Sequence, residues 1–359
     1  MRKMLPNLSG PQTLGKGPLF WVLFFAAVIA AAGVPLFASS FAVSNFSYFL
    51  VWTFMAMGLS LMWGYAGILS FGQTAFFGLA GYAYGVISIN WGDAHGLTWA
   101  ALLASLTLPV ILASVLGYLI FYGGIREVFV GIVTLSVTLV FETFMAQTAG
   151  PEWTIGEARL NGFNGMSGMP ALTINFHSGD LIFDGSPFYW LLLALVVLAY
   201  LGLRVLVNSR FGNVLVAIRE NPERAEMLGY NIRFYQLIVF TIGGFFAGLS
   251  GAFYTLWGSY ITPSSMGLNA AALPIIWVAA GGRTDITAVL VSTIALTWVS
   301  QQLAIYGSQY ALVLMGIVLL LVVLFAPNGF VVSVWRSLSK RSFVREAADP
   351  VRKFTSAAD

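Results

Sequence analysis

Apolar runs of about 20 residues, the length that an α-helix needs to cross a bilayer, follow one another along most of the chain. Ten such runs are candidate transmembrane helices: 18–38, 41–63, 66–90, 97–121, 128–149, 187–207, 234–257, 268–281, 284–303 and 308–326. The run 268–281 is short and contains Pro274, and the run 66–90 opens with glycines and polar residues. The pattern predicts an all-α polytopic membrane protein with about ten transmembrane helices.

Charged residues are almost absent from two long parts of the chain. Between residues 17 and 125 the only Asp, Glu, Lys or Arg is Asp93, and between 234 and 335 there are only Arg283 and Asp285. Charged residues make up 9% of the chain, whereas a soluble domain has about 25%. The composition therefore excludes an ordinary soluble protein. The chain has no cysteine, which excludes disulfides, thiolate metal sites and cysteine nucleophiles.

The basic residues indicate how the helices are oriented. With ten helices and a cytoplasmic N-terminus, only Arg159 of the 17 Lys and Arg residues falls outside, as the positive-inside rule requires. We therefore expect both termini in the cytoplasm. The net charge of +3 comes from these residues at the membrane edges, so it does not predict nucleic-acid binding. An inverted five-plus-five repeat is compatible with this topology, because five helices is an odd number.

This topology divides the chain into a cytoplasmic N-tail, 1–17, a transmembrane domain, 18–329, and a basic cytoplasmic C-tail, 330–359, that we expect to contact anionic lipid headgroups of the bilayer. The transmembrane domain contains a long external loop, 150–186, and a charged cytoplasmic loop, 208–233. The external loop is mildly acidic and rich in glycine, asparagine and proline. It suits either a docking surface for an external partner or a solvated cover over a pore.

The loop 208–233 has the signals of a short helix. Asn221 suits the N-cap and Pro222 the first helical position. Glu223 lies where the helix dipole favours an anion, and Gly229 suits the left-handed residue that ends a helix. We expect this loop to present a docking surface to a cytoplasmic partner, formed by Arg219, Glu220, Asn221, Pro222, Glu223, Arg224, Ala225, Glu226 and Gly229. The alternative is a solvated loop whose arginines only set the topology.

Polar residues inside two predicted spans are candidates for contact with a solute. Glu142 lies well inside the span 128–149, where a charge is costly unless it faces a cavity or a partner. It suits either recognition of an ammonium group or a structural hydrogen bond. The segment 64–85 has six glycines and also Ser70, Gln73 and Thr74. Such a segment allows either a broken helix whose amide ends face an anionic solute or close packing of helices.

Two other patterns carry no chemistry that we can support. Residues 10–17 nearly form a nucleotide-binding P-loop, but the final Ser or Thr is missing and Pro18 and a membrane span follow. His95 and His177 lie in predicted external loops without a second ligand, so we expect no metal site and no cofactor. No arrangement of catalytic residues indicates an enzyme.

Four segments resemble the permeases of bacterial branched-chain amino acid ABC importers. Glu223-Arg224-Ala225, three further residues and Gly229 resemble the Glu-Ala-Ala–x3–Gly loop of such permeases, within the similar string FGNVLVAIRENPERAEMLGYNIRFYQLIVFTIGGFFAGLSGAFYT. The strings GYAGILSFGQTAFFGLAGY, from Gly64, GGR, from Gly281, and FAPNG, from Phe325, are similar to the family in the same order. The fifth span departs from it, because Glu142 follows Leu139 by three residues rather than four.

The resemblance implies a membrane subunit that does no covalent chemistry. Its expected partners are a second, homologous permease, two cytoplasmic ATPase subunits and an extracytoplasmic solute-binding protein, in a bacterial inner membrane. ATP-driven closure of the ATPases would move the helix around Pro222, so 208–233 is a coupling loop. Branched-chain amino acids are the expected substrate, and urea or short amides are the alternative. A self-sufficient secondary transporter or channel is the alternative from another class.

Overall fold

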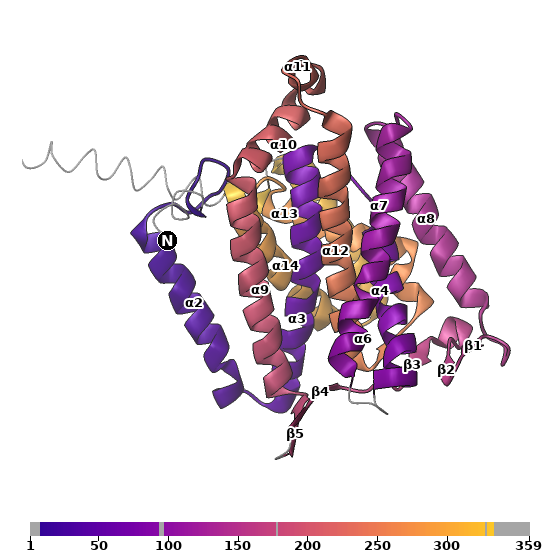
Figure 1. The fold of residues 1–359 in the computed structure, drawn as a ribbon. Helices are drawn as coiled ribbons and strands as arrows, with labels where there is room; N and C mark the ends of the chain where they lie inside the picture. Colours follow the sequence, from indigo (N-terminus) through magenta and orange to yellow (C-terminus); the bar gives the residue numbers. More distant parts are fainter. Residues whose placement is uncertain (1–7, 93–96, 177–178, 327–328, 334–359) are drawn as a thin grey trace, which may run out of the picture.

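The computed structural model describes residues 8–92, 97–176, 179–326 and 329–333 (Figure 1). In these ranges the chain is mostly helical, and seven helices are long and apolar enough to cross a membrane: Pro18–Phe37, Ser40–Tyr65, Thr98–Tyr122, Val128–Gln147, Ser186–Val207, Ile232–Gly258 and Ile286–Ala304. The predicted spans 66–90, 268–281 and 308–326 contain helices that do not meet this criterion. His95, His177 and most of the C-tail lie outside the described ranges.

The α-helices are α2 (Pro18–Phe37), α3 (Ser40–Leu59), α4 (Gln73–Ile87), α6 (Thr98–Ser105), α7 (Thr107–Tyr122), α8 (Val128–Gln147), α9 (Ser186–Val207), α10 (Arg210–Glu220), α11 (Pro222–Met227), α12 (Ile232–Gly258), α13 (Leu268–Gly281), α14 (Ile286–Ala304) and α15 (Ser308–Phe325). The π-helices η1 (Ser60–Tyr65) and η2 (Ser88–Gly92) extend α3 and α4, and η3 (Gly162–Asn164) and η4 (Pro263–Met266) are 3-10 turns. The long helices form one bundle, with α10 and α11 at one end and the strands at the other (Figure 1).

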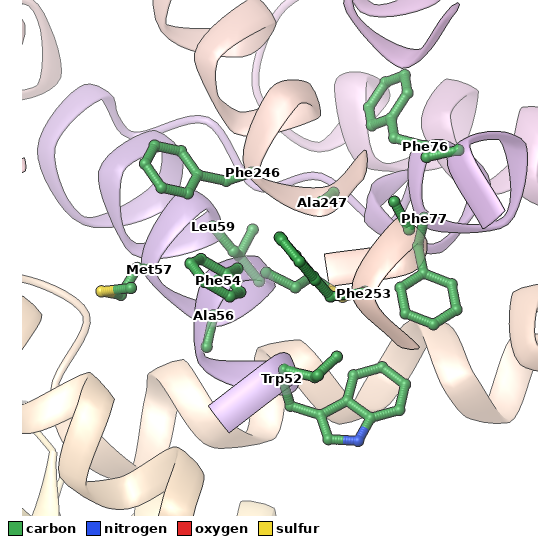
Figure 2. Close-up of a cluster of buried hydrophobic side chains, with 14 of the residues drawn as sticks. Trp52, Phe54, Ala56, Met57, Leu59, Phe76, Phe77, Phe246, Ala247 and Phe253 are labelled. Carbon is green, nitrogen blue, oxygen red and sulfur yellow. The ribbon is translucent and has the colours of Figure 1, made fainter. Parts of the chain in front are cut away.

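The core of the bundle lies where α3, α4 and α12 meet. Large side chains from all three helices pack there, among them Trp52, Phe77 and Phe253 (Figure 2). The helices approach closely because α12 presents glycines to its neighbours: a Cβ at Gly251 would lie only 1.9 Å from the backbone oxygen of Phe77. Small residues at helix contacts are the usual means of close packing in membranes, where the hydrophobic effect does not drive association.

The helical chain is interrupted within the start of one predicted span and directly before another. After η1 the helical conformation ends at Ala66, and α4 begins only at Gln73. The prediction of one continuous span over 66–90 was therefore wrong at its start, because the glycines there permit a conformation such as that of Gly67, with φ of +74°. Likewise α13 has only 14 residues and follows a strand and the turn η4. We call 66–72 the first break and 259–267 the second break.

The expectation of an all-α chain missed short strands at the end opposite α10 and α11. The strands are β1 (Thr154–Ile155), β2 (Ala158–Arg159), β3 (Met166–Ser167), β4 (Leu172–Phe176), β5 (Gly179–Phe183) and β6 (Tyr260–Ile261). They form three antiparallel pairs, β1 with β2, β3 with β6, and β4 with β5. The pairing of Met166 with Ile261 attaches the loop 150–186 to the second break.

Residues 8–17, which include the segment 10–17 that resembles a P-loop, lie as a strap against α9, α14 and η1. Arg204 of α9 is wholly buried and donates hydrogen bonds to the backbone oxygen of Leu8 and, at 2.6 Å, to that of Gly15. The carboxylate of Asp285 accepts from the N–H of Leu14 at 2.5 Å. The Tyr65 hydroxyl donates to the backbone oxygen of Gln12 at 3.1 Å. The backbone of the strap therefore pairs with side chains of the bundle.

Because Arg204 bonds to the strap, we predict that Arg204→Ala destabilises the protein. The substitution leaves buried backbone oxygens and the Tyr200 hydroxyl without their donor, and such losses each cost about 1–3 kcal/mol. We expect a lower thermal-unfolding midpoint in detergent, by tryptophan fluorescence. Arg210→Ala removes an exposed arginine nearby and serves as the control. Equal midpoints for the two variants would show that the strap adds no stability.

Candidate functional site

The loop 208–233 folds as two short helices with the predicted cap and stop. The Asn221 side chain accepts from the backbone N–H of Arg224 at 2.8 Å, and Pro222 is the first residue of α11. At the other end Gly229 has φ of +89°, and the N–H of Tyr230 donates to the backbone oxygen of Ala225 at 3.2 Å. This pattern satisfies the last carbonyls of the helix. The termini of α11 are therefore specified by local sequence.

The helix α11 is held on α10 by a small apolar contact. Ala225 is buried and packs with Val214 and Ile218 of α10. Met227 and Leu228, by contrast, are 86% and 70% exposed at the tip of the loop. Sequence reasoning named the charged residues here and missed these two. Their exposure could have been predicted from the sequence, because a helix of six residues that buries Ala225 cannot also bury its other apolar side chains.

Arg219 has a different position from the other charged residues of the loop. Its guanidinium donates to the backbone oxygen of Gly64, at the end of η1, and to the Glu220 carboxylate at 2.5 Å. A Cβ at Gly67 would lie 3.1 Å from the Cγ of Arg219. The side chain therefore contacts the first break rather than projecting outward as the sequence suggested. Glu220, Glu223, Arg224 and Glu226 are exposed.

The first break brings the three predicted polar residues into the interior. Ser70, Gln73 and Thr74 are all buried. The Ser70 hydroxyl accepts from the N–H of Gly72 at 3.1 Å, and the Gln73 amide donates to the sulfur of Met62. The side-chain oxygen of Gln73 is buried and has no hydrogen-bond partner among the described residues. Such a group needs a partner, because burying it without one is costly.

The helix α8 contacts both breaks through one face. Thr134, Thr138 and Glu142 follow one another at intervals of four residues and therefore share that face. The Thr134 hydroxyl accepts from the N–H of Phe71 at 3.1 Å, and the Thr138 hydroxyl donates to the backbone oxygen of Phe71 at 3.2 Å. These two bonds satisfy backbone groups that the first break leaves outside any helix.

Glu142 lies at the second break. It is half-buried, and a Cβ at Gly267 would lie 2.5 Å from its Oε1. Thr74 of α4 reaches the preceding residue, with its hydroxyl 3.4 Å from the backbone oxygen of Met266. The structure therefore brings Thr74 and Glu142 to successive residues of one connection. Within the described ranges, no three His, Asp or Glu side chains gather as a metal site would require.

Comparison with known proteins identifies a matching family and similar proteins from other organisms. Residues 41–323 match the model of a family described as the permease component of the branched-chain amino acid transport system. The high-affinity branched-chain amino acid transport system permease protein LivM of Escherichia coli K12 is 24% identical, over 91% of this chain and 80% of the relative. A probable LivM permease protein of Methanocaldococcus jannaschii is 26% identical, over 79% of this chain and 91% of the relative. No solved structure gave a significant match.

Proposed function

The chain belongs to the family of branched-chain amino acid transport permeases, whose model spans residues 41–323, and we propose that it is one half of the translocation unit of an importer in a bacterial inner membrane. The other half is a second, homologous permease. Two ATPase subunits drive the unit from the cytoplasm, and an extracytoplasmic protein delivers the solute. The chain is a transport permease rather than an enzyme. We propose branched-chain amino acids as its substrates, in preference to urea or short amides.

The capped and anchored position of α11 at the end of the bundle is the observation that carries this proposal. A helix of six residues is not stable alone in water, yet α11 is capped by Asn221, ended at Gly229 and anchored through Ala225. It presents two large exposed apolar side chains, Met227 and Leu228, at the end of the bundle opposite the strands (Figure 1). A helix that is capped and anchored in this way suits the binding of a protein partner. A solvated loop that only sets the topology would need neither the cap nor the anchor.

The proposed topology has ten membrane segments in two inverted halves. The first half is α2, α3, α4, α6 with α7, and α8, and the second is α9, α12, α13, α14 and α15. The third segment of each half is short and follows a break: α4 has 15 residues and α13 has 14. Short, interrupted segments in corresponding positions are typical of transporters with inverted repeats, and they mark the binding site.

The breaks supply complementary groups for a zwitterionic solute. The amide ends of α4 and α13 favour a carboxylate. The buried oxygen of Gln73 lacks a partner in the described chain, and Glu142 provides a negative charge beside the start of α13. Ser70 and Thr74 belong to the same path. A movement of α10 would be transmitted to the first break, because Arg219 of α10 donates a hydrogen bond to the backbone oxygen of Gly64.

Docking of the ATPases predicts that Arg224→Glu or Met227→Glu lowers uptake at least tenfold. Central side chains of an interface typically contribute about 2 kcal/mol or more, which corresponds to more than a tenfold loss of affinity. The measurement is co-purification of the ATPase subunits together with amino acid uptake. Arg159→Glu makes the same change on β2, at the opposite end, and should retain the ATPases. Normal co-purification and uptake in the α11 variants would refute the docking role.

The path predicts that Glu142→Gln lowers uptake of leucine by about tenfold or more, since a hydrogen bond to a charged group contributes about 1.5–3 kcal/mol. Assembly with the ATPases should be unchanged, because Glu142 contacts the second break, which pairs with a strand at the end of the bundle opposite α10 and α11 (Figure 1). Thr143→Val alters the exposed neighbouring residue and is the control. Uptake at the wild-type rate would remove Glu142 from the path.

A further inference from the structure

A pocket of about 290 Å³ lies between three segments at the end of the bundle that carries α10 and α11. Its walls come from the start of the first break, from the connection between α7 and α8, and from α10, α11 and the start of α12. The pocket therefore adjoins both the proposed solute path and the coupling loop. Its size is close to the lower limit of about 300 Å³ that is usual for small-molecule sites.

The floor of this pocket is apolar, with Ile68, Phe121, Ile125 and Ile218 among its lining residues. Around it stand three cations and three anions: Arg126, Arg219, Arg233, Glu127, Glu223 and Glu226. In the described part of the chain the only ion pair is Arg219 with Glu220, whose carboxylate does not line the pocket. The pocket charges thus sum to zero but do not neutralise one another by direct contact.

Opposite charges around an apolar floor match one class of ligand, a zwitterion with a hydrocarbon side chain. Arginines bind a carboxylate, glutamates bind an ammonium group, and the floor contacts the side chain. An anion such as phosphate would meet three carboxylates, and a metal ion would meet three guanidinium groups. We propose that this pocket binds an α-amino acid with an apolar side chain from the cytoplasm. The proposal rests on the proposed function for the identity of the solute and for the orientation.

Occupation of the pocket has a consequence for the coupling loop. Glu223 and Glu226 are three residues apart on α11 and share a face, whereas Arg126 and Glu127 belong to the connection between α7 and α8. A ligand held by both sides ties α11 to that connection. Accumulated amino acid therefore restrains the helix that the ATPases must move, and import slows as the product rises.

The test is ligand-observed NMR with the full-length chain, without partners, in lipid nanodiscs. Because five of the six charged residues are exposed, each contact is weakened by solvent, and we expect L-leucine to bind with a dissociation constant on the order of 1 mM. The probe 4-methylpentanoate lacks the ammonium group and 3-methylbutylamine lacks the carboxylate, so both should bind at least fivefold more weakly. Equal binding of either probe, or no binding of leucine, would overturn the proposal.

Variants locate the site. Glu226→Gln and Arg233→Gln should each weaken leucine binding by about fivefold, the upper range for exposed ion pairs. Arg210→Gln changes an exposed arginine of α10 outside the pocket and should have no effect. Loss of binding in Glu142→Gln, with binding retained in Glu226→Gln and Arg233→Gln, would place the leucine in the membrane path instead and overturn the proposal. The assay contains no ATPase, so a failure of the docking prediction does not alter its outcome.

Discussion

The need to satisfy every backbone polar group inside a bilayer governs this structure. An unpaired N–H or C=O in hydrocarbon costs several kcal/mol, so helices can stop at membrane depth only where side chains replace the lost bonds. At the first break Thr134 and Thr138 of α8 provide those bonds to both polar groups of Phe71. The break is therefore not independent of α8, and the two must move together. Glu142 continues the same face of α8 toward the second break.

The other end of the bundle follows the same rule with charged side chains. Arg204 is wholly buried and is acceptable there because the strap supplies backbone oxygens to its guanidinium. Arg219 does the same for the open end of η1, through its bond to Gly64. In each case one arginine bonds to backbone groups of a segment distant in sequence. These contacts join α9 and α10 to the strap and to the first break, so α10 is held on the bundle and α11 is its exposed extension.

The sequence predicted the features that are set by adjacent residues, namely membrane helices and helix termini. It did not predict the features that are set by contacts between segments distant in sequence. Membrane helices such as 128–149 were visible because apolar length decides insertion, and the termini of α11 were visible because Asn221, Pro222 and Gly229 act on adjacent residues. The start of α4, the burial of Arg204 and the inward position of Arg219 were not, since each is set by a contact with another segment. The strand pair of Met166 with Ile261 was hidden for the same reason.

The short length of α11 would allow it to contact both of its proposed ligands, the ATPase and the solute, at once. Residues three apart share a face of a helix, and a step of one residue turns that face by about a quarter of a circle or more. Glu223 and Glu226 thus line the pocket, while Arg224 and Met227 are absent from its walls and remain exposed. A partner bound on the exposed face and a solute bound in the pocket would meet the same six residues. Because Ala225 alone anchors α11 in the apolar contact with α10, little packing opposes a shift of this helix, and either ligand can bias its position.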